Sequence, residues 1–456
     1  MDEPVPVLEP VLPRRPRRIG VAAAAVAVVA VAVAAVWGVL VLARPAPATS
    51  SPLRLVLVET DGAIATTDVF GATHEPHEAP GVRYQFPAWS PDGSQVAAIG
   101  HDGNAVTVDV FDAGVGASGL PRRIYESSDR PAFYLYWAPD SEHVTFLTTE
   151  PDPDDIALRI APADGSSPAE VVRAAAPFYW DFVNSSRLLL HTGSTGTEAF
   201  TGEIDLEGAS LEDAAIESGL FRAPAVGGGG SSRAYVAASG DDPADGGTMV
   251  VEARDGSVRH EIPVRGAAAF GFDPTSTTLA FIAPDEPTDP AAPIPSGPLR
   301  TVDAATGEVR TLLDANVLAF FWSPDGRTIA ALDLRPADQQ PDPGQARTLR
   351  GQLATSAALP PLAAGTPGIG LHLSFIDTET AAVRSERDLR VSELFAFQVL
   401  PYFDQYALSH RFWAPDSSAI VLPLAGEDGL DRVVVIAPDS SDPREVATGW
   451  VGFWSP

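Results

Sequence analysis

The sequence predicts an all-β protein folded as a β-propeller of four-stranded blades. A short unit, made of an aromatic residue, a Ser-Pro-Asp-Gly-like turn and an apolar strand, recurs at intervals of about 45 residues. Most of these turns are followed by two more strand-like pieces, such as AVTVDVFD and RRIYE, which gives four short strands per unit. Four antiparallel strands per repeat is the composition of a propeller blade.

The aromatic residue that precedes each turn aligns the repeats. Equivalent positions are held by Trp89, Trp137, Phe182, Phe272, Trp322, Trp413 and Trp454. Because each ring occupies the same structural place, we expect the rings to pack between adjacent blades rather than to bind a ligand.

The turns also repeat an acidic residue. These residues are Asp92, Asp140, Asp325 and Asp416. We expect each carboxylate to cap its own turn by accepting backbone N–H bonds. With one carboxylate per blade, they would meet at a metal ion only if they lined the mouth of the channel.

Counting strands predicts eight blades, with seven as the alternative. Eight segments resemble the second strand of a blade, and the first of them, Leu53–Glu59, has no first strand before it. The chain ends in GWVGFWSP, which resembles a first strand with no blade after it. We therefore expect the two ends to complete one blade, which would remove free sheet edges. The weakest repeat is VGGGGSSRAYVAAS, whose Gly227 lies 45 residues from both Phe182 and Phe272.

The N-terminal residues predict a membrane anchor. Residues 1–18 end in PRRPRR and precede 25 uncharged residues, 19–43. About 20 apolar residues span a bilayer, and the arginines place the 1–18 tail in the cytoplasm by the positive-inside rule. We expect a transmembrane signal anchor at 19–43, a stiff linker at 44–52 and an extracytoplasmic β-propeller at 53–456. The alternative is secretion after cleavage near Ala48.

One repeat is interrupted. Trp322 and Trp413 are 91 residues apart, twice the usual spacing. Residues 335–366 are rich in Pro, Ala, Gln and Gly and lack strand periodicity, so we interpret them as a long flexible loop inserted in one blade. The insertion is either a tolerated addition or a segment that binds a partner.

Composition excludes several classes of function. The formal net charge is −30, and all 30 basic residues are arginine. Nucleic-acid binding needs clustered cations, so we expect none. A partner steered by charge would be basic. The chain has no cysteine, which rules out disulfides and thiolate chemistry.

Few polar clusters suggest chemistry. The run His74–Glu78 lacks the helical spacing of a zinc site and contains Pro76, so we expect a solvated loop. The acidic turn at Glu150–Asp155 lacks the register of a calcium loop. Ser409, His410 and Arg411 precede Trp413 and are the polar residues that we expect to face the channel, where a structural network is the favoured interpretation. No nucleophile elbow, phosphate loop or dinucleotide motif is present, so we assign no catalytic residue, metal or cofactor.

The W-[SA]-P-D-[GS] turns at Trp89, Trp137, Trp322 and Trp413 resemble those of TolB-type propellers, which also occur in prolyl-oligopeptidase-like enzymes. The resemblance covers residues 53–456 and implies the repeat class. TolB is a scaffold that binds partner proteins without catalysis, so the resemblance implies a binding role of this kind. The repeats at Phe182, Gly227 and Phe272 depart from the signature.

These observations predict a membrane-anchored, extracytoplasmic, non-catalytic scaffold that binds a protein or another envelope component through its blade-connecting loops. One alternative is an extracytoplasmic ligand-binding or sensor module. The other is a propeller enzyme, such as a hydrolase or a lyase, with its site in the axial channel.

Overall fold

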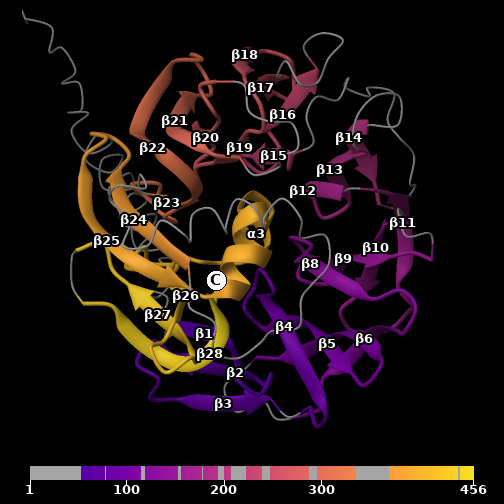
Figure 1. The fold of residues 1–456 in the computed structure, drawn as a ribbon. Helices are drawn as coiled ribbons and strands as arrows, with labels where there is room; N and C mark the ends of the chain where they lie inside the picture. Colours follow the sequence, from indigo (N-terminus) through magenta and orange to yellow (C-terminus); the bar gives the residue numbers. More distant parts are fainter. Residues whose placement is uncertain are drawn as a thin grey trace, which may run out of the picture. The chain divides into compact units, whose positions relative to one another are not determined.

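Short antiparallel strands joined by tight turns build most of the protein (Figure 1). The computed structural model describes residues 53–456 except 78, 114–118, 152–155, 177, 194–199, 207–221, 239–246, 287–294, 335–368 and 440–441. The predicted tail, anchor and linker, the Ala48 site and the insertion at 335–366 lie outside these residues. Within them, none of the helices has the length and apolar character that a bilayer span requires.

One sheet shows the regular blade. Its strands follow one another in the order β4 (Val82–Trp89), β5 (Gln95–Asp102), β6 (Ala105–Asp112) and β7 (Arg122–Ser127). The middle of β5 is buried on both faces, because neighbouring sheets cover it on each side. In the outermost strand β7 only Ile124 is buried, and the other residues are half-buried or exposed. The apolar core therefore lies along the inner strands.

Three more sheets follow in chain order. Their strands are β8 (Ala132–Trp137), β9 (His143–Thr149), β10 (Ile156–Pro162) and β11 (Glu170–Ala175); β12 (Phe178–Asn184), β13 (Arg187–Thr192) and β14 (Phe200–Asp205); and β15 (Ala225–Gly227), β16 (Ser232–Ala238), β17 (Gly247–Ala253) and β18 (Arg259–Val264). The weak repeat around Gly227 thus forms a four-stranded sheet. Its turn runs through Gly228, Gly229 and Gly230, whose φ angles are +58°, +61° and +91°, a conformation that glycine adopts without steric cost.

The remaining strands are linked in one continuous series of pairings. They are β19 (Ala269–Phe272), β20 (Thr278–Ile282), β21 (Gly297–Asp303), β22 (Val309–Trp322), β23 (Thr328–Asp333), β24 (Ile369–Asp377), β25 (Val383–Val391), β26 (Ile420–Ala425), β27 (Asp431–Ile436), β28 (Arg444–Trp454), β1 (Arg54–Glu59), β2 (Ile64–Asp68) and β3 (His74–His77). The long strands β22 and β28 change partner along their length. The first part of β22 pairs with β21 and its end pairs with β23, so the outer strand of one sheet continues into the inner strand of the next.

The C-terminal strand pairs with the first strand of the described chain, as GWVGFWSP predicts. In this antiparallel pairing Leu55 lies opposite Trp454 and Val58 lies opposite Val451. The earlier part of β28 pairs with β27. One strand therefore joins the beginning of this unit to its end and covers the edge of β1.

The expectation of a solvated loop at His74–Glu78 is wrong for its first four residues. His74–His77 form β3, which pairs with β2 and is the outermost strand of its sheet. Pro76 lies opposite Ala65. An edge strand accepts proline because the backbone N–H that proline lacks has no ladder partner on the outer side.

Four strands per repeat imply an inner strand that ends at each aromatic residue, and before Trp413 this expectation is wrong. The chain between β25 and β26 forms a π-helical turn η3 (Phe395–Val399), a 3-10 turn η4 (Leu400–Tyr402) and helix α3 (Phe403–Ser409); we call Phe395–Ser409 the axial segment. Trp413 retains only an isolated bridge to Ile420. Helix α3 contacts β8, β12, β19 and β22, and in Figure 1 it lies inside the circle of sheets.

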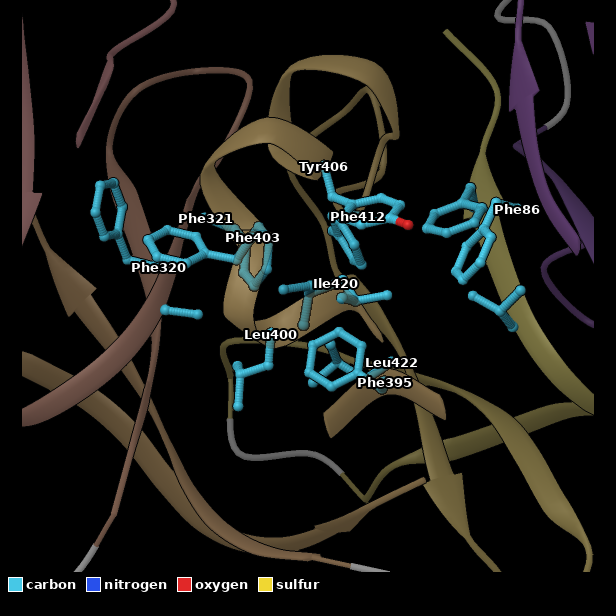
Figure 2. Close-up of a cluster of buried hydrophobic side chains, with 14 of the residues drawn as sticks. Phe86, Phe320, Phe321, Phe395, Leu400, Phe403, Tyr406, Phe412, Ile420 and Leu422 are labelled. Carbon is cyan, nitrogen blue, oxygen red and sulfur yellow. The ribbon is translucent and has the colours of Figure 1, made fainter. Parts of the chain in front are cut away.

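The apolar side chains of the axial segment explain this departure. Phe395, Leu400, Phe403 and Tyr406 are at most 5% exposed. The Phe403 ring packs on Phe320, with ring centroids 5.3 Å apart (Figure 2). Burying one such side chain contributes about 1.5–3 kcal/mol. Burial of these four side chains therefore favours the observed turns and helix over an extended strand.

Candidate functional site

A cavity of about 360 Å³ lies beside the axial segment. Helix α3, β15, β19, the end of β22 and the residues before Trp413 form its walls. The aromatic lining residues are Phe270, Phe272, Phe320, Phe321, Trp322, Phe403, Phe412 and Trp413. The charged and titratable lining residues are Asp273, Asp404, His410 and Arg411. A cavity of this volume accommodates a small ligand or one or two side chains of a partner.

The repeat tryptophans fix the spacing of the sheets around this cavity. The Trp413 indole Nε1 donates to the Phe321 carbonyl at 3.0 Å, and the Trp322 Nε1 donates to the Gly271 carbonyl at 3.1 Å. Trp137 and Trp89 make the same bond to Ala88 and Phe453, at 2.9 and 3.2 Å. Each indole therefore donates to the residue just before the equivalent aromatic residue of the neighbouring repeat.

Trp454 is the exception among these residues. Its side chain is fully buried, and its Nε1 has no hydrogen-bond partner among the described residues. The Phe412 carbonyl, which holds the position equivalent to Phe321, accepts from the Val421 backbone N–H. The repeat in which the carbonyl does not accept from an indole is therefore the one where the axial segment joins Trp413.

The turn aspartates lie in separate turns. Asp140 accepts from the Glu142 backbone N–H at 2.8 Å, and Asp416 accepts from that of Ser418 at 3.0 Å. Burial alone would raise the pKa of Asp92, but hydrogen bonds from Ser90 and Ser94 outweigh burial and lower it. The same balance lowers the pKa of Asp325. These carboxylates act within their own turns and do not face one common ion.

The turns are also joined to one another. The Asp92 backbone N–H donates to Ser141 Oγ at 3.1 Å, and the Asp325 backbone N–H donates to Ser417 Oγ at 3.0 Å. Both serines have positive φ, +62°, where the equivalent turns carry glycine. The serine hydroxyl therefore links adjacent turns. This hydrogen bond offsets the steric cost of a left-handed backbone at a residue other than glycine.

Of the three predicted channel residues, Ser409 and His410 form a buried hydrogen-bonded chain. Tyr134 donates its hydroxyl to Ser409 Oγ at 2.7 Å, and Ser409 Oγ lies 2.7 Å from His410 Nδ1. His410 Nε2 lies 3.3 Å from the Phe86 carbonyl. A carbonyl only accepts, so Nε2 carries the proton and Nδ1 accepts from Ser409.

The environment of His410 makes it a weak base. The residue is 3% exposed, and burial lowers the pKa of its imidazole to about 4. A general base works best with a pKa near the working pH. The hydrogen bonds of Ser409 and His410 link the axial segment to Tyr134 of β8 and Phe86 of β4.

Gln405 provides a further anchor. Its side-chain amide donates to the Trp180 carbonyl at 2.8 Å and accepts from the Trp180 N–H at 3.0 Å. These two bonds satisfy the inner edge of β12 as a neighbouring strand would. Sequence analysis missed Phe403, Gln405 and Tyr406, although the spacing of Phe395, Val399, Phe403 and Tyr406 is helical and indicates the segment.

Arg411 differs from its two neighbours. Its side chain is exposed to solvent yet lines the cavity. Burial by the surrounding walls lowers the pKa of its guanidinium, and Tyr136 acts in the opposite direction. Among the described residues, its guanidinium has no hydrogen-bond or ion-pair partner.

The two acids of the cavity wall differ: Asp273 is hydrogen-bonded within its own turn, whereas Asp404 Oδ2 is buried without a hydrogen-bond partner among the described residues. Asp273 accepts from Thr275 Oγ1 and from the Thr278 backbone N–H of its own turn. Asp404 is 4% exposed; burial raises the pKa of its carboxyl, while the charge of Arg222 acts in the opposite direction. Neither carboxylate neutralises Arg411.

The acidic turn at Glu150–Asp155 is described only in part. Glu150 pairs with Arg130 and Arg159 at 2.9 and 2.7 Å, and residues 152–155 lie outside the described part. Across the part of the chain that the structure describes, no three His, Asp or Glu side chains gather as metal ligands would.

Comparison with known proteins supports the fold and does not define a family. No protein family and no curated protein matches the sequence. A crystal structure of the eukaryotic initiation factor is similar over 89% of this chain and 99% of its own, with a TM-score of 0.52 and 10% identity. The β-propeller domain of the Trilobed protease from Pyrococcus furiosus is similar over 80% and 98%, with a TM-score of 0.44 and 11% identity.

TolB from Acinetobacter baumannii is also similar, over 57% of this chain and 65% of its own, with a TM-score of 0.35 and 14% identity. At such identities the similarity concerns the fold alone. The strand order makes the protein an all-β chain of antiparallel sheets, several of them four-stranded, which is consistent with a β-propeller (Figure 1). TolB is among the structures to which it is similar.

Proposed function

We propose that this protein is a non-catalytic binding protein that holds a partner protein at the mouth of its propeller. The observation that carries the proposal is the cavity beside the axial segment. Its walls are aromatic, and its one exposed charged side chain, Arg411, has no partner among the described residues. Rigid apolar pockets with a few placed polar groups are typical of binding sites.

The contents of the ring axis favour binding over catalysis. The axial segment fills the centre with buried aromatic rings (Figure 2). Its histidine is too weak a base for acid–base chemistry near neutral pH. An axial enzyme would need polar groups that converge on a substrate, whereas His410 and Ser409 face other parts of the protein.

We further infer eight blades for the ring. The pairings divide into eight successive groups when β22 and β28 are each shared between two neighbours. The sheet β15–β18, which contains the weakest repeat, supports eight rather than seven. The apolar segment 19–43 and its flanking arginines support display of this ring from a membrane, outside the cytoplasm.

Proximity labelling in the native cells, with the enzyme tag on the exported side, tests this proposal. Ala407 lines the cavity and is exposed on α3, so Ala407→Trp should fill the entrance without disturbing the core. We expect the variant to lose at least one protein that the wild type labels. The matched control is Ala72→Trp, an exposed alanine near the outer strand β3. Identical labelling by all three proteins would refute the proposal.

A further inference from the structure

The guanidinium of Arg411 combines two properties, since it lies in the wall of the cavity and forms no ion pair with a described residue. The chain has twice as many acidic as basic residues, 60 against 30, and other arginines, such as Arg123 and Arg254, bind carboxylates at 3.1 and 2.6 Å. Arg411 makes no such pair with any described residue, although two acids share its cavity. Other exposed arginines, such as Arg265 and Arg444, also form no ion pair with a described residue, but they do not line the cavity.

The cavity keeps those acids away for structural reasons. The Asp273 carboxylate accepts from Thr275 and Thr278, which ties it to its turn. The carboxylate of Asp404 accepts from the Gln405 backbone N–H at 3.1 Å and lies in the field of Arg222. The hydrogen-bond donors of Arg411 are therefore left for a group from outside the chain.

Arginine presents its donors in a planar fork that matches a carboxylate. Partial enclosure strengthens such a pair, because water competes less for the charges. The adjacent walls are aromatic, with Phe272, Trp322 and Phe412 among them. A bound group should therefore carry its negative charge next to an apolar body.

We propose that this cavity binds a carboxylate attached to an apolar side chain, and that this pair is the anchor by which the partner is held. The carboxylate is either the C-terminus of the partner or an acidic side chain beside an apolar one. This inference rests on the proposed binding function and adds the chemistry of the bound group. The body of the partner can still be basic, as the net charge of −30 favours, because only the anchor enters the cavity.

Peptide binding to the intact chain in detergent micelles tests the proposal. The probes are acetyl-Ala-Phe with a free carboxylate, the same peptide as its amide, and acetyl-Asp-Phe-amide, with binding followed by calorimetry. We expect the free acid to bind at least about tenfold more tightly than the amide, as loss of one charge-assisted pair implies. Tight binding of acetyl-Asp-Phe-amide instead would assign the anchor to a side chain.

Variants at Arg411 assign the effect to this side chain. Arg411→Gln should remove the preference for the acid, and Arg411→Lys should retain only part of it because lysine lacks the fork. The matched control is Arg265→Gln, an exposed arginine outside the cavity, which should bind like the wild type. Unchanged thermal unfolding of each variant shows that the fold is retained.

The results separate this inference from the proposed function. Equal affinity for all three peptides, no binding of any peptide at millimolar concentration, or an unchanged preference for the carboxylate peptide in Arg411→Gln would overturn the carboxylate anchor. If the anchor holds while Ala407→Trp labels the same proteins as the wild type, the partner-binding function fails and the chemistry of the cavity stands.

Discussion

The sheet β4–β7 and the strands β26–β28 begin with the same kind of turn but differ at the ring axis. In the first, the eight-residue strand β4 ends at Trp89 and pairs with β5. In the second, the axial segment leads into Trp413, which retains only the bridge to Ile420. Both tryptophans nevertheless donate to a carbonyl of the neighbouring repeat. The tryptophan and its turn are therefore enough to place a blade, and the residues upstream are free to acquire another role.

The largest expected effect comes from the core of the axial segment. Phe403 is 1% exposed and packs on Phe320 and Phe321. Phe403→Ala should lower the free energy of unfolding by about 3–5 kcal/mol, as loss of a buried ring does. Denaturant unfolding measures the change. Leu120→Ala, at a side chain that is 75% exposed, should change it by less than about 0.5 kcal/mol. A cost below about 1 kcal/mol at Phe403 would mean that the axial segment is only a loop laid on the ring.

The second effect depends on pH. The folded protein holds His410 neutral, with a pKa of about 4 against 6.5 for a free histidine. The folded state therefore binds fewer protons than the unfolded state between these values, and stability falls as the pH drops through this window, by up to about 3 kcal/mol. We expect the wild type to have a higher free energy of unfolding than His410→Gln at pH 7. This difference should become smaller as the pH falls to 4.5.

The control for the pH experiment is Phe403→Ala, which alters the same segment without removing a titrating group. Its deficit relative to the wild type should stay constant with pH. Asp181, whose pKa burial raises to about 6, titrates in every variant and cancels from these differences. A constant gap for His410→Gln would show that His410 does not resist protonation in the folded state.

The third effect compares two buried tryptophans. Trp413→Phe removes the bond to the Phe321 carbonyl and leaves that acceptor buried, whereas the Trp454 indole has no acceptor to lose. Trp413→Phe and Trp454→Phe remove a similar volume, so the difference between their changes in unfolding free energy reports the contribution of the hydrogen bond. Trp413→Phe should be the more destabilising by about 1–3 kcal/mol in denaturant unfolding. Equal costs would show that ring packing alone sets the spacing of the blades.

The smallest effect concerns the turns that both regions share. Ser141→Ala keeps the left-handed backbone but loses the bond from the Asp92 N–H, so we expect a loss of about 1 kcal/mol. Ser141→Gly loses the same bond but relieves the backbone, so its stability should stay close to that of the wild type. If both variants lose the same amount, the positive φ of Ser141 carries no strain.

The repeat class could be predicted from the sequence because its signals are local. Trp89, Asp92 and Gly93 lie within five residues and determine one turn, and the copies at Trp137 and Trp322 give the period. The pairing of GWVGFWSP with β1 followed from the same alignment. The axial segment could not be predicted from the repeat, which requires a strand before Trp413. The helical spacing of Phe395, Phe403 and Tyr406 is the signal that indicates a helix there instead.

The candidate site was less accessible to sequence reasoning. Arg411 was singled out, but nothing local shows that Asp273 is held by its turn or that Asp404 lies near Arg222. The cavity walls come from strands nearly a hundred residues apart in the chain, such as β15 and the end of β22. The availability of a charge depends on where all of its neighbours point, which is a property of the folded chain.

The shared strand β28 has a consequence for the making of the protein. Trp89 and its acceptor on Phe453 are 364 residues apart. At ordinary rates of synthesis this interval lasts roughly 20–70 s, during which β1 has no neighbour on the edge that β28 will cover. An open strand edge is a template for pairing with other chains. The nascent chain therefore exposes this edge of β1 until β28 has been synthesised.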